Sequence, residues 1–463
     1  MEKKQFIEEV AKKLYENKCD LFVGSGISAP SNLPTWKDFL QPYLSDLKIK
    51  LNDCDDLPLM AQYVVNQNSG NRNIISEAIF DVFGKDYPLN PFHAAIADFP
   101  VKTVWTTNYD LLLEKAFAHR EVRVIASEDA LIHPHNSTDV EIIKLHGCAK
   151  GAVREIILTR ADYDCFLHNK PKLAQRLRES FINRSILFLG YSCHDPNIQS
   201  VMTQAYQMMG ELTQKHYILI DRLEQKGGES VKEFLERSRR FSCWLSELKR
   251  VGICSLDVPR DQISEILKEI ARKSHGNTVF VTGTHNVNDK LKKYVQKVGK
   301  YLAQQPSVIL NNGQSEGVGH AALSAFMEYT IEKKQDINQR IRIYPNPYAV
   351  SPEFSSDRTL IPALKQARTP LMINTSFIVL FPGGLGTKAE AELACDKNRP
   401  VFPIVQKKED FNTEAISYIL QNKSNKTFLR EYVPSYCQQL YVGKIPSEQA
   451  TLCAIKEIIH GKN

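Results

Sequence analysis

Short apolar runs that end in small or polar residues, each followed by a longer helical stretch, recur along this chain and limit how it can fold. In its first half the runs are Cys19–Val23, Val101–Thr106, Ile142–Leu145, Ser185–Leu189 and Tyr217–Ile220. Their length suits buried strands, and the helical stretches between them are typical of βαβ units. The pattern predicts a doubly wound α/β domain that binds its ligand at the carboxyl ends of the strands.

The pattern restarts in the second half of the chain. A helical run at Ile263–Arg272 precedes the polar segment Lys273–Asn277, which we expect to be a linker. The strand candidates that follow are Val279–Val281, Ser307–Leu310, Arg340–Tyr344, Phe377–Phe381 and Val401–Val405. Because 463 residues exceed the roughly 250–300 that one core supports, we expect two Rossmann-like α/β domains, residues 1–274 and residues 277–463.

The composition limits the classes of protein to which this chain can belong. The ten cysteines never form CxxC pairs, which argues against a zinc ribbon and a disulfide framework, so we expect no metal and a reducing cytoplasm. The charged N-terminal segment does not suit a secretory signal, and no apolar run reaches the roughly 18 residues that span a bilayer. A net charge of +6 without a dense basic tract suits anionic small molecules at least as well as nucleic acid. We expect neither a membrane nor a nucleic-acid partner.

A glycine turn follows the first strand candidate. It consists of Gly24, Ser25, Gly26, Ile27 and Ser28. Glycines at such a position let backbone N–H groups approach a phosphate, and a helix N-terminus adds favourable charge. Taken alone the turn is weak evidence, because glycine turns after strands are common.

Polar residues end the other strand candidates. Asn108, between Thr107 and Asp110, carries a carboxamide that suits a ribose hydroxyl or a water, although an Asx turn would also explain it. His146 suits a base near neutral pH, although a lone histidine at a strand end is more often structural. A later turn from Gly190 to Ser192 is a further candidate contact for a nucleotide.

Together and in this order, these segments resemble the sirtuin family, which has a GAGIS-type phosphate loop, a TQN-type segment, an HG pair and a glycine–serine turn. The resemblance spans about residues 15–225 and implies that Asn108 and His146 are catalytic. The NAD contacts that it implies are Gly24, Ser25, Gly26, Ile27, Ser28, Thr107, Asp110, Gly190 and Ser192. The chain lacks the two CxxC pairs of sirtuin deacetylases, and Asn32–Trp36 replaces their GIPxFR-type stretch, so deacetylation is disfavoured.

An NAD-binding core is sufficient for a simpler reaction. Nicotinamide leaves NAD+ as a neutral molecule and needs no general acid, while the ribosyl centre passes through an oxocarbenium-like state. Our hypothesis is that Asn108 positions the ribose and the attacking water and that His146 accepts a proton. NAD+ is then a substrate and not a cofactor, and the product is linear or cyclic ADP-ribose.

A second glycine turn lies in the C-terminal half, where the strand candidate Phe377–Phe381 continues into Pro382–Glu390. A strand, a glycine turn and a helix start that carries Thr387 predict an anion cradle, and Glu390 suits ribose hydroxyls. Arg368 stands fourteen residues before Pro382.

This set resembles the PGGxGTxxE hallmark of the LOG-like family and the wider SLOG group of nucleotide-sensing domains. The contacts to a signal nucleotide that the resemblance implies are Gly283, Thr284, Gly317, Gly319, Arg358, Arg368, Gly383, Gly384, Gly386, Thr387, Lys388 and Glu390. For Arg358 and Lys388 an exposed helix-face charge is an equal alternative. LOG enzymes hydrolyse cytokinin nucleotides, so nucleotide hydrolysis through Glu390 stays open.

A sirtuin-like core followed by a SLOG domain resembles the effector family of the bacterial Thoeris anti-phage system. The resemblance implies that a partner TIR-domain protein makes a cyclic ADP-ribose isomer, which binds the SLOG domain and switches on NAD+ degradation. It also implies homotetramers or larger assemblies. The alternatives are a non-catalytic nucleotide-binding module and a phosphoribohydrolase in the C-terminal half.

Overall fold

The computed structural model describes residues 1–52, 55–132, 138–210, 214–347 and 361–460. The chain divides into two compact units, Met1–Ser274 and His275–Asn463. None of the helices in these ranges has the length and apolar character that crossing a membrane requires.

The sheet of the N-terminal unit has, within the described residues, seven strands in the order β3-β4-β2-β1-β5-β6-β7, and each strand pairs with its neighbours in parallel. The strands are β1 (Cys19–Val23), β2 (Thr103–Thr106), β3 (Val122–Ile125), β4 (Val140–Lys144), β5 (Ser185–Leu189), β6 (His216–Asp221) and β7 (Ile253–Val258). The chain begins in the middle with β1, adds strands on one side, and then continues from β5 on the other. A crevice forms where the order reverses, and ligands bind there in such sheets.

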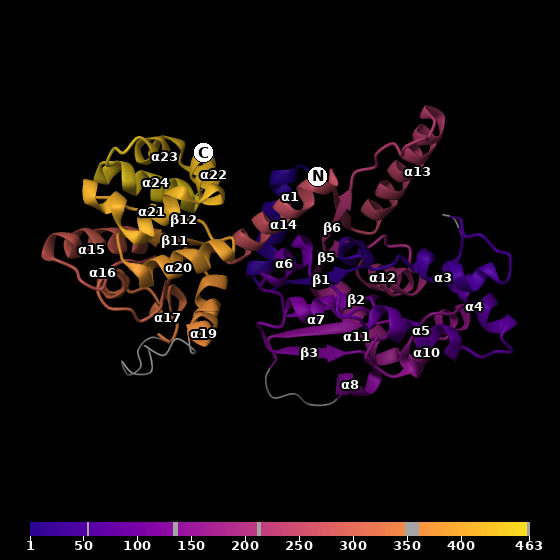
Figure 1. Ribbon diagram of the computed structural model, residues 1–463. Coiled ribbons are helices and arrows are strands. Elements are labelled where there is room, and N and C mark those ends of the chain that lie inside the picture. The colour runs from indigo at the N-terminus through magenta and orange to yellow at the C-terminus, as the bar shows by residue number, and fades with distance from the viewer. Residues whose placement is uncertain (53–54, 133–137, 211–213, 348–360, 461–463) are drawn as a thin grey trace. The chain divides into compact units, whose positions relative to one another are not determined.

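Helices cover both faces of this sheet (Figure 1). They are α1 (Lys3–Tyr15), α2 (Ser25–Ser28), α3 (Trp36–Ser45), α4 (Leu57–Gln67), α5 (Asn73–Phe83), α6 (Pro91–Ala97), α7 (Leu112–Ala116), α8 (Glu128–Ile132), α9 (Arg160–Asp164), α10 (Phe166–Asn169), α11 (Pro171–Asn183), α12 (Pro196–Met209), α13 (Val231–Arg250) and α14 (Arg260–Ser274). Successive β1 side chains point to opposite faces: Leu21 packs with Phe6 and Ile266, and Phe22 packs with Phe181 and Val201. Helix α13 projects away from the rest of its unit and buries only Leu248.

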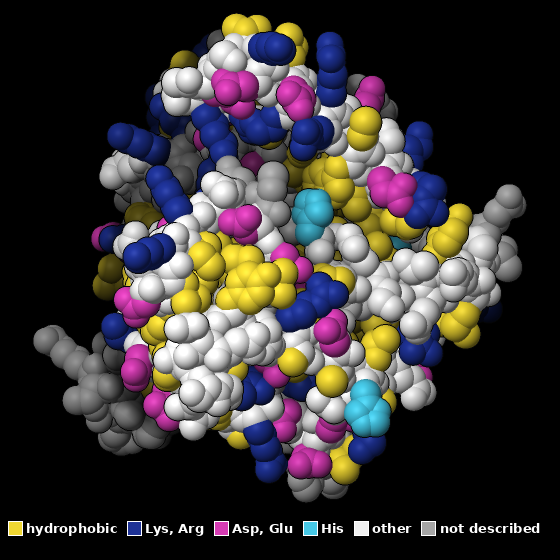
Figure 2. Space-filling view, turned by 90° about the vertical axis from the view of Figure 1, so that its right-hand side faces the viewer, with side chains coloured by type: hydrophobic (Ala, Val, Ile, Leu, Met, Phe, Trp, Pro, Cys, Tyr) yellow, Lys and Arg dark blue, Asp and Glu magenta, His cyan; other side chains and the backbone are white. Residues whose placement is uncertain are grey.

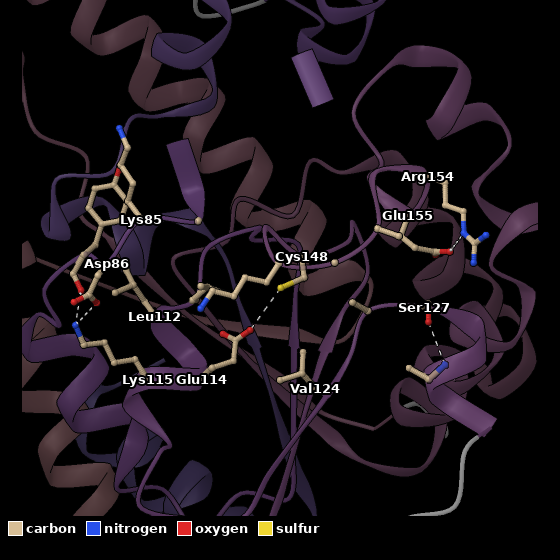
Figure 3. A pocket seen from close by; sticks show the side chains of 18 residues that line it. Lys85, Asp86, Leu112, Glu114, Lys115, Val124, Ser127, Cys148, Arg154 and Glu155 are labelled. Atoms are coloured by element: carbon tan, nitrogen blue, oxygen red, sulfur yellow. Dashed lines mark hydrogen bonds and ion pairs between the residues drawn. The ribbon is translucent and has the colours of Figure 1, made fainter. Parts of the chain in front are cut away.

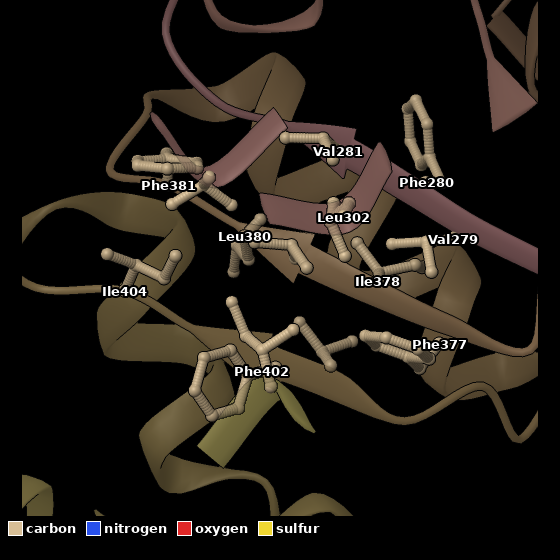
Figure 4. Close-up of a cluster of buried hydrophobic side chains, with 14 of the residues drawn as sticks. Val279, Phe280, Val281, Leu302, Phe377, Ile378, Leu380, Phe381, Phe402 and Ile404 are labelled. Carbon is tan, nitrogen blue, oxygen red and sulfur yellow. The ribbon is translucent and has the colours of Figure 1, made fainter. Parts of the chain in front are cut away.

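The sheet of the C-terminal unit has, within the same ranges, five parallel strands in the order β10-β9-β8-β11-β12. The strands are β8 (Asn277–Thr282), β9 (Val308–Asn312), β10 (Ile341–Ile343), β11 (Phe377–Leu380) and β12 (Val401–Pro403). The helices are α15 (Asp289–Ala303), α16 (Val318–Glu332), α17 (Ile337–Arg340), α19 (Ile361–Ile373), α20 (Leu385–Asp396), α21 (Glu414–Gln421), α22 (Lys423–Tyr432), α23 (Pro434–Tyr441) and α24 (Glu448–His460). Apolar side chains of β8, β11 and β12 form the core of this unit (Figure 4). Its strand order reverses between β8 and β11.

The predicted fold class, two mostly parallel doubly wound sheets, is confirmed, with three local differences. The strands β3 and β7 were not predicted, because as edge strands they carry several part-exposed residues and lack a continuous apolar run. The predicted linker is much shorter than Lys273–Asn277: α14 continues to Ser274 and β8 begins at Asn277. Gly276, at a φ of 69°, lies in the short connection between them.

Basic and acidic side chains are interspersed on the face shown in Figure 2, with hydrophobic side chains among them.

Two buried histidines of the N-terminal unit predict how its stability depends on pH. Burial lowers the pKa of His93 and of His216 to about 4. An unfolded histidine has a pKa of about 6.5, so between about pH 6.5 and 4 the unfolded chain binds more protons than the folded chain. The two neutral, buried histidines therefore contribute fully to the stability of the folded unit above about pH 6.5. This contribution is lost as the pH falls from about 6.5 to 4.

His93→Leu should therefore reduce the acid sensitivity of the unit by a free energy of order 2 kcal/mol at pH 4. Neither ring nitrogen of His93 has a hydrogen-bond partner within the described part of the chain, so the substitution breaks no such bond. Denaturant unfolding at several pH values, followed by tryptophan fluorescence, measures the effect, because the three tryptophans at 36, 105 and 244 all lie in this unit. His168→Leu, at an exposed position, is the control. Equal pH dependence of His93→Leu and the parent would contradict the prediction.

Candidate functional site

A cavity of about 690 Å³ lies at the carboxyl edge of the N-terminal sheet, and we call it the strand-end cavity. It is formed by the segments after β1, β2, β4 and β5, which flank the point where the strand order reverses. The sequence-predicted residues that line it are Ser25, Gly26, Ser28, Thr107, Asn108, Asp110, His146, Gly190 and Ser192. Gly24 and Ile27 belong to the same turn without lining the cavity.

The glycines of the β1 turn and the β5 turn are needed because the two turns touch. A Cβ on Gly24 would lie 2.5 Å from the carbonyl oxygen of Gly190, and one on Gly26 would lie 2.9 Å from it. Gly190 itself has a φ of 59°. The N–H groups of Gly24 and Gly26 donate to the carbonyl oxygens of Leu189 and Gly190. The close approach of the two backbones therefore explains why these positions are glycines. The sequence analysis predicts another reason, the approach of their amides to a phosphate.

Hydrogen bonds to the β1 turn hold Asn108 in place. Its Nδ2 donates to the Ser28 hydroxyl at 3.2 Å, and its backbone N–H donates to Thr106 Oγ1 at 3.0 Å. Thr106 in turn donates to the carbonyl oxygen of Val23. Only 7% of Asn108 is exposed, so its carboxamide is fixed at the cavity wall.

His146 is also buried, with 4% exposed, and packs edge-on against Tyr163 at a ring-centroid distance of 5.3 Å. Its Nε2 lies 3.2 Å from Asp195 Oδ2, which is ion-pair distance without hydrogen-bond alignment. A carboxylate beside one ring nitrogen holds the ring in one orientation.

The sequence analysis gave no catalytic role to Asp195, which the structure places beside His146. Its Oδ1 accepts the N–H groups of Asn197 and Ile198 as the N-cap of α12, while Oδ2 faces His146 and accepts from the Tyr163 hydroxyl at 3.4 Å. Burial alone would raise the pKa of the carboxyl, but His146 and these hydrogen bonds outweigh it and hold the pKa below its ordinary value. The sequence did hold a signal, because an Asp-Pro pair at the start of an amphipathic run is typical of a helix N-cap.

Aromatic side chains also line the strand-end cavity. Trp36 and Tyr163 stack at 6.5 Å with 26° between their planes, and Tyr191 also lines the cavity. Trp36 belongs to the stretch Asn32–Trp36 that departs from the sirtuin pattern, and most of that stretch lines the cavity. Aromatic faces together with fixed polar groups suit a flat heterocycle that carries hydroxyls.

An adjoining cavity of about 660 Å³ continues past the two glycine turns. It shares Gly26, Gly190, Tyr191, Ser192 and His194 with the strand-end cavity. It extends to Asp221 at the end of β6 and to Trp244 on α13, where Trp244 stacks on His194 at 5.7 Å. The two cavities together suit an elongated ligand.

In the C-terminal unit, Arg368 and Glu390 form a buried ion pair beside the point where the strand order reverses. Arg368 is 2% exposed, and its Nη2 donates to Glu390 Oε1 at 2.6 Å while Nη1 donates to the carbonyl oxygen of Gly313 at 2.8 Å. Glu390 Oε2 accepts from the Thr282 hydroxyl. Two residues that were predicted separately as ligand contacts therefore contact each other.

The other predicted residues of this unit divide into packed and open positions. Thr387 donates to the carbonyl oxygen of Gly283 at 3.1 Å, and a Cβ on Gly383 would collide with that threonine. Gly317 and Gly319 are likewise closely packed, and Thr284 accepts from the N–H of Asn286. Open space surrounds Gly384 and Gly386.

The two predicted basic residues of this unit differ in what can be said of them. Lys388 lies 4.0 Å from Glu392 and 3.8 Å from Glu414, which fits a partly exposed charge on a helix face. Arg358 lies outside the described residues.

Within the described residues no group of His, Cys, Asp and Glu side chains is arranged to hold a metal ion.

Residues 102–240 match the SIR2-like domain family, and residues 262–406 match the Sir2- and TIR-associating SLOG family. The chain is similar to three curated proteins called NAD(+) hydrolase ThsA. It is 25% identical to that of Bacillus cereus (strain MSX-D12) over 92% of this chain and 90% of the relative. It is 27% identical to that of Acinetobacter baumannii (strain 532279), over 82% and 80%. It is 25% identical to that of Enterococcus faecium, over 76% and 77%.

Proposed function

We propose that this chain, in which a SIR2-like domain precedes a Sir2- and TIR-associating SLOG domain, hydrolyses NAD+ to nicotinamide and ADP-ribose. The observation that carries the proposal is the meeting of three largely buried side chains, Asn108, His146 and Asp195, in the strand-end cavity. The similarity to NAD(+) hydrolases over most of the chain supports it.

The two adjoining cavities suit the two halves of a dinucleotide. We place the nicotinamide riboside in the strand-end cavity, against Trp36 and Tyr163, and the pyrophosphate beside Ser25 and Ser192. The adenosine then occupies the adjoining cavity, where an acidic residue at a strand end, Asp221, suits ribose hydroxyls.

The chemistry follows from the positions of three side chains. The bond between ribose C1′ and the nicotinamide nitrogen breaks with its electron pair going to nicotinamide, which leaves neutral. Asn108 orients the ribose and a water, whose oxygen forms the new bond to C1′ as His146 takes its proton. With Nε2 turned to Asp195, Nδ1 is the nitrogen that accepts this proton, and the carboxylate stabilises the imidazolium that results.

Asp195→Asn tests this positioning role. We expect nicotinamide release to slow about 10- to 100-fold at a nearly unchanged KM, because the ring loses its charged partner. Tyr163→Phe, which removes only the hydroxyl that contacts Asp195, should slow the reaction less than threefold. A parental kcat for Asp195→Asn, or a loss confined to KM, would contradict the assignment.

For regulation, we propose that a cyclic ADP-ribose-type signal from a partner TIR-domain protein binds the C-terminal unit and switches on hydrolysis in a bacterial, cytoplasmic, anti-phage response. The signal must bind the active arrangement more tightly, by about 1.4 kcal/mol for each tenfold change in population. A tetramer or larger homo-oligomer is part of the same proposal. The contacts of Glu390 argue for sensing over nucleotide hydrolysis in this unit, because Arg368 and Thr282 already engage both carboxylate oxygens.

The test is nicotinamide release from NAD+ by the purified chain, with and without a panel of cyclic ADP-ribose isomers. Release that rises with one isomer and vanishes in Asn108→Ala supports the proposal. NAD+ binding without release under any condition would favour a non-catalytic nucleotide-binding module. Free base from AMP that depends on Glu390 would favour the phosphoribohydrolase.

A further inference from the structure

A third cavity, of about 790 Å³, lies at the same edge of the N-terminal sheet, and we call it the flanking cavity. Its 18 lining residues include Lys85, Leu111, Glu114, Val124, Cys148 and Lys150. They include no residue of the strand-end or adjoining cavity. The walls are nevertheless continuous with the proposed NAD+ site, because Leu111 follows Asp110 directly and Cys148 stands two residues after His146.

The carboxylates of the flanking cavity are all matched by cations. Lys115 Nζ lies 2.7 Å from Asp86 Oδ1, and Arg154 Nε lies 3.5 Å from Glu155 Oε1. Glu114 is paired at 2.6 Å with Lys144, which is fully buried behind the wall. The cavity therefore has no uncompensated negative charge.

Two of the lysines that line the flanking cavity are not matched by a carboxylate of the described residues. Lys85 and Lys150 are exposed, and across the described ranges neither lies within ion-pair distance of a carboxylate. They come from different segments of the wall, the first after α5 and the second after β4. A cavity with two surplus cations at its edge attracts an anion.

Glu114 is a second feature of the flanking cavity that points to a ligand. Its Oε1 accepts from Lys144, but its Oε2 is buried and has no hydrogen-bond partner in the part of the chain that the structure describes. Figure 3 shows Glu114 facing Cys148, between Lys115 on one side and Ser127 and Arg154 on the other. A buried carboxylate oxygen without a donor is costly, and a ligand hydroxyl or amine would satisfy it.

The remaining wall is apolar. It is formed largely by Leu111, Leu112, Val124, Ala126, Ala130 and Ala152. Such a wall suits a flat ring, and the cavity volume lies in the range of about 300–1,000 Å³ that small-molecule sites occupy.

We infer that the flanking cavity binds a nucleoside phosphate. Its ring lies against the apolar wall, a hydroxyl or amine donates to Glu114 Oε2, and its phosphate lies near Lys85 and Lys150. The ligand is either a free mononucleotide or the ADP-ribose that the proposed reaction would release. The site itself is independent of whether that reaction takes place.

Photolabelling of the full chain locates this site directly. We expect 8-azido-AMP, 8-azido-ADP-ribose or both to label peptides that contain residues 84–87, 111–115 or 124–130, saturably and in competition with the unlabelled ligand. Peptide mapping separates this label from any label at residues 190–196 or in the C-terminal unit. Label from the AMP probe identifies a mononucleotide site, and label from the ADP-ribose probe alone identifies a product site.

The double variant Lys85→Ala/Lys150→Ala should lower that labelling at least fivefold. Lys4→Ala/Lys12→Ala is the matched control, because both lysines are exposed on α1 and line none of the three cavities. The inference is overturned if neither probe labels the three peptides, or if the Lys85/Lys150 variant is labelled like the parent. Nicotinamide release is measured separately, so either result leaves the proposed hydrolase activity to its own test.

Discussion

His146→Ala is expected to lower nicotinamide release at least 100-fold while the N-terminal unit stays folded. A positioned general base contributes about 10²- to 10⁴-fold to a rate. Among the residues that line the strand-end cavity, the other histidine is His194, which stacks on Trp244 of α13. The measurement is the initial rate of nicotinamide formation at saturating NAD+, together with tryptophan fluorescence to confirm folding.

His194→Ala is the matched control for this prediction. It removes an imidazole from the same cavity but leaves the contact between His146 and Asp195 intact, so we expect a weaker effect that appears mainly in KM. Asn108→Ala should resemble His146→Ala, because it removes the group that orients ribose and water. If His146→Ala retained most of the parental rate, the base would have to be another group, and the mechanism proposed above would be wrong.

The segments that form the site could be predicted from the sequence, because a parallel sheet gathers its strand ends along one edge. Asn108 and His146 each follow a compact apolar run, so a local pattern placed both at that edge. The Asp-Pro pair at Asp195 marks the start of α12, but the sequence does not show that the second carboxylate oxygen turns toward His146. That contact depends on tertiary packing.

The partners of charged side chains could not be predicted from the sequence either. Arg368 and Glu390 are 22 residues apart, and their spacing could be recognised, but the sequence does not show that they pair with each other. The glycines at 24 and 26 were correctly noticed as special, yet the reason is the backbone of Gly190, which is 164 residues away from the nearer of them. Local patterns therefore predicted the strands and the strand-end residues, and the partners of those residues came from long-range packing.

Glu390→Ala is expected to destabilise the C-terminal unit by about 3–5 kcal/mol, because it leaves the Arg368 guanidinium buried without a counter-charge. Arg368 cannot turn out to solvent easily, since it also donates to Gly313 and lies over the Phe280 ring. Amide hydrogen exchange of β8 and β11 in the full chain measures this loss as faster exchange of the core strands. At 1.4 kcal/mol for each factor of ten, the expected acceleration is roughly 10²- to 10³-fold or more.

A double variant separates the charge effect from loss of the fold. Arg368→Met/Glu390→Leu removes both charges, and replacing a buried pair by apolar residues of similar volume is often neutral or stabilising, so strand protection should return to within about 1 kcal/mol of the parent. If the pair also contacts the signal nucleotide, this variant should stay folded and keep its basal nicotinamide release but no longer respond to the cyclic ADP-ribose isomer. Unchanged exchange in Glu390→Ala would mean that water or another group already neutralises Arg368. A double variant that is stable and still responds would leave the pair a structural element and place the signal site elsewhere in the C-terminal unit.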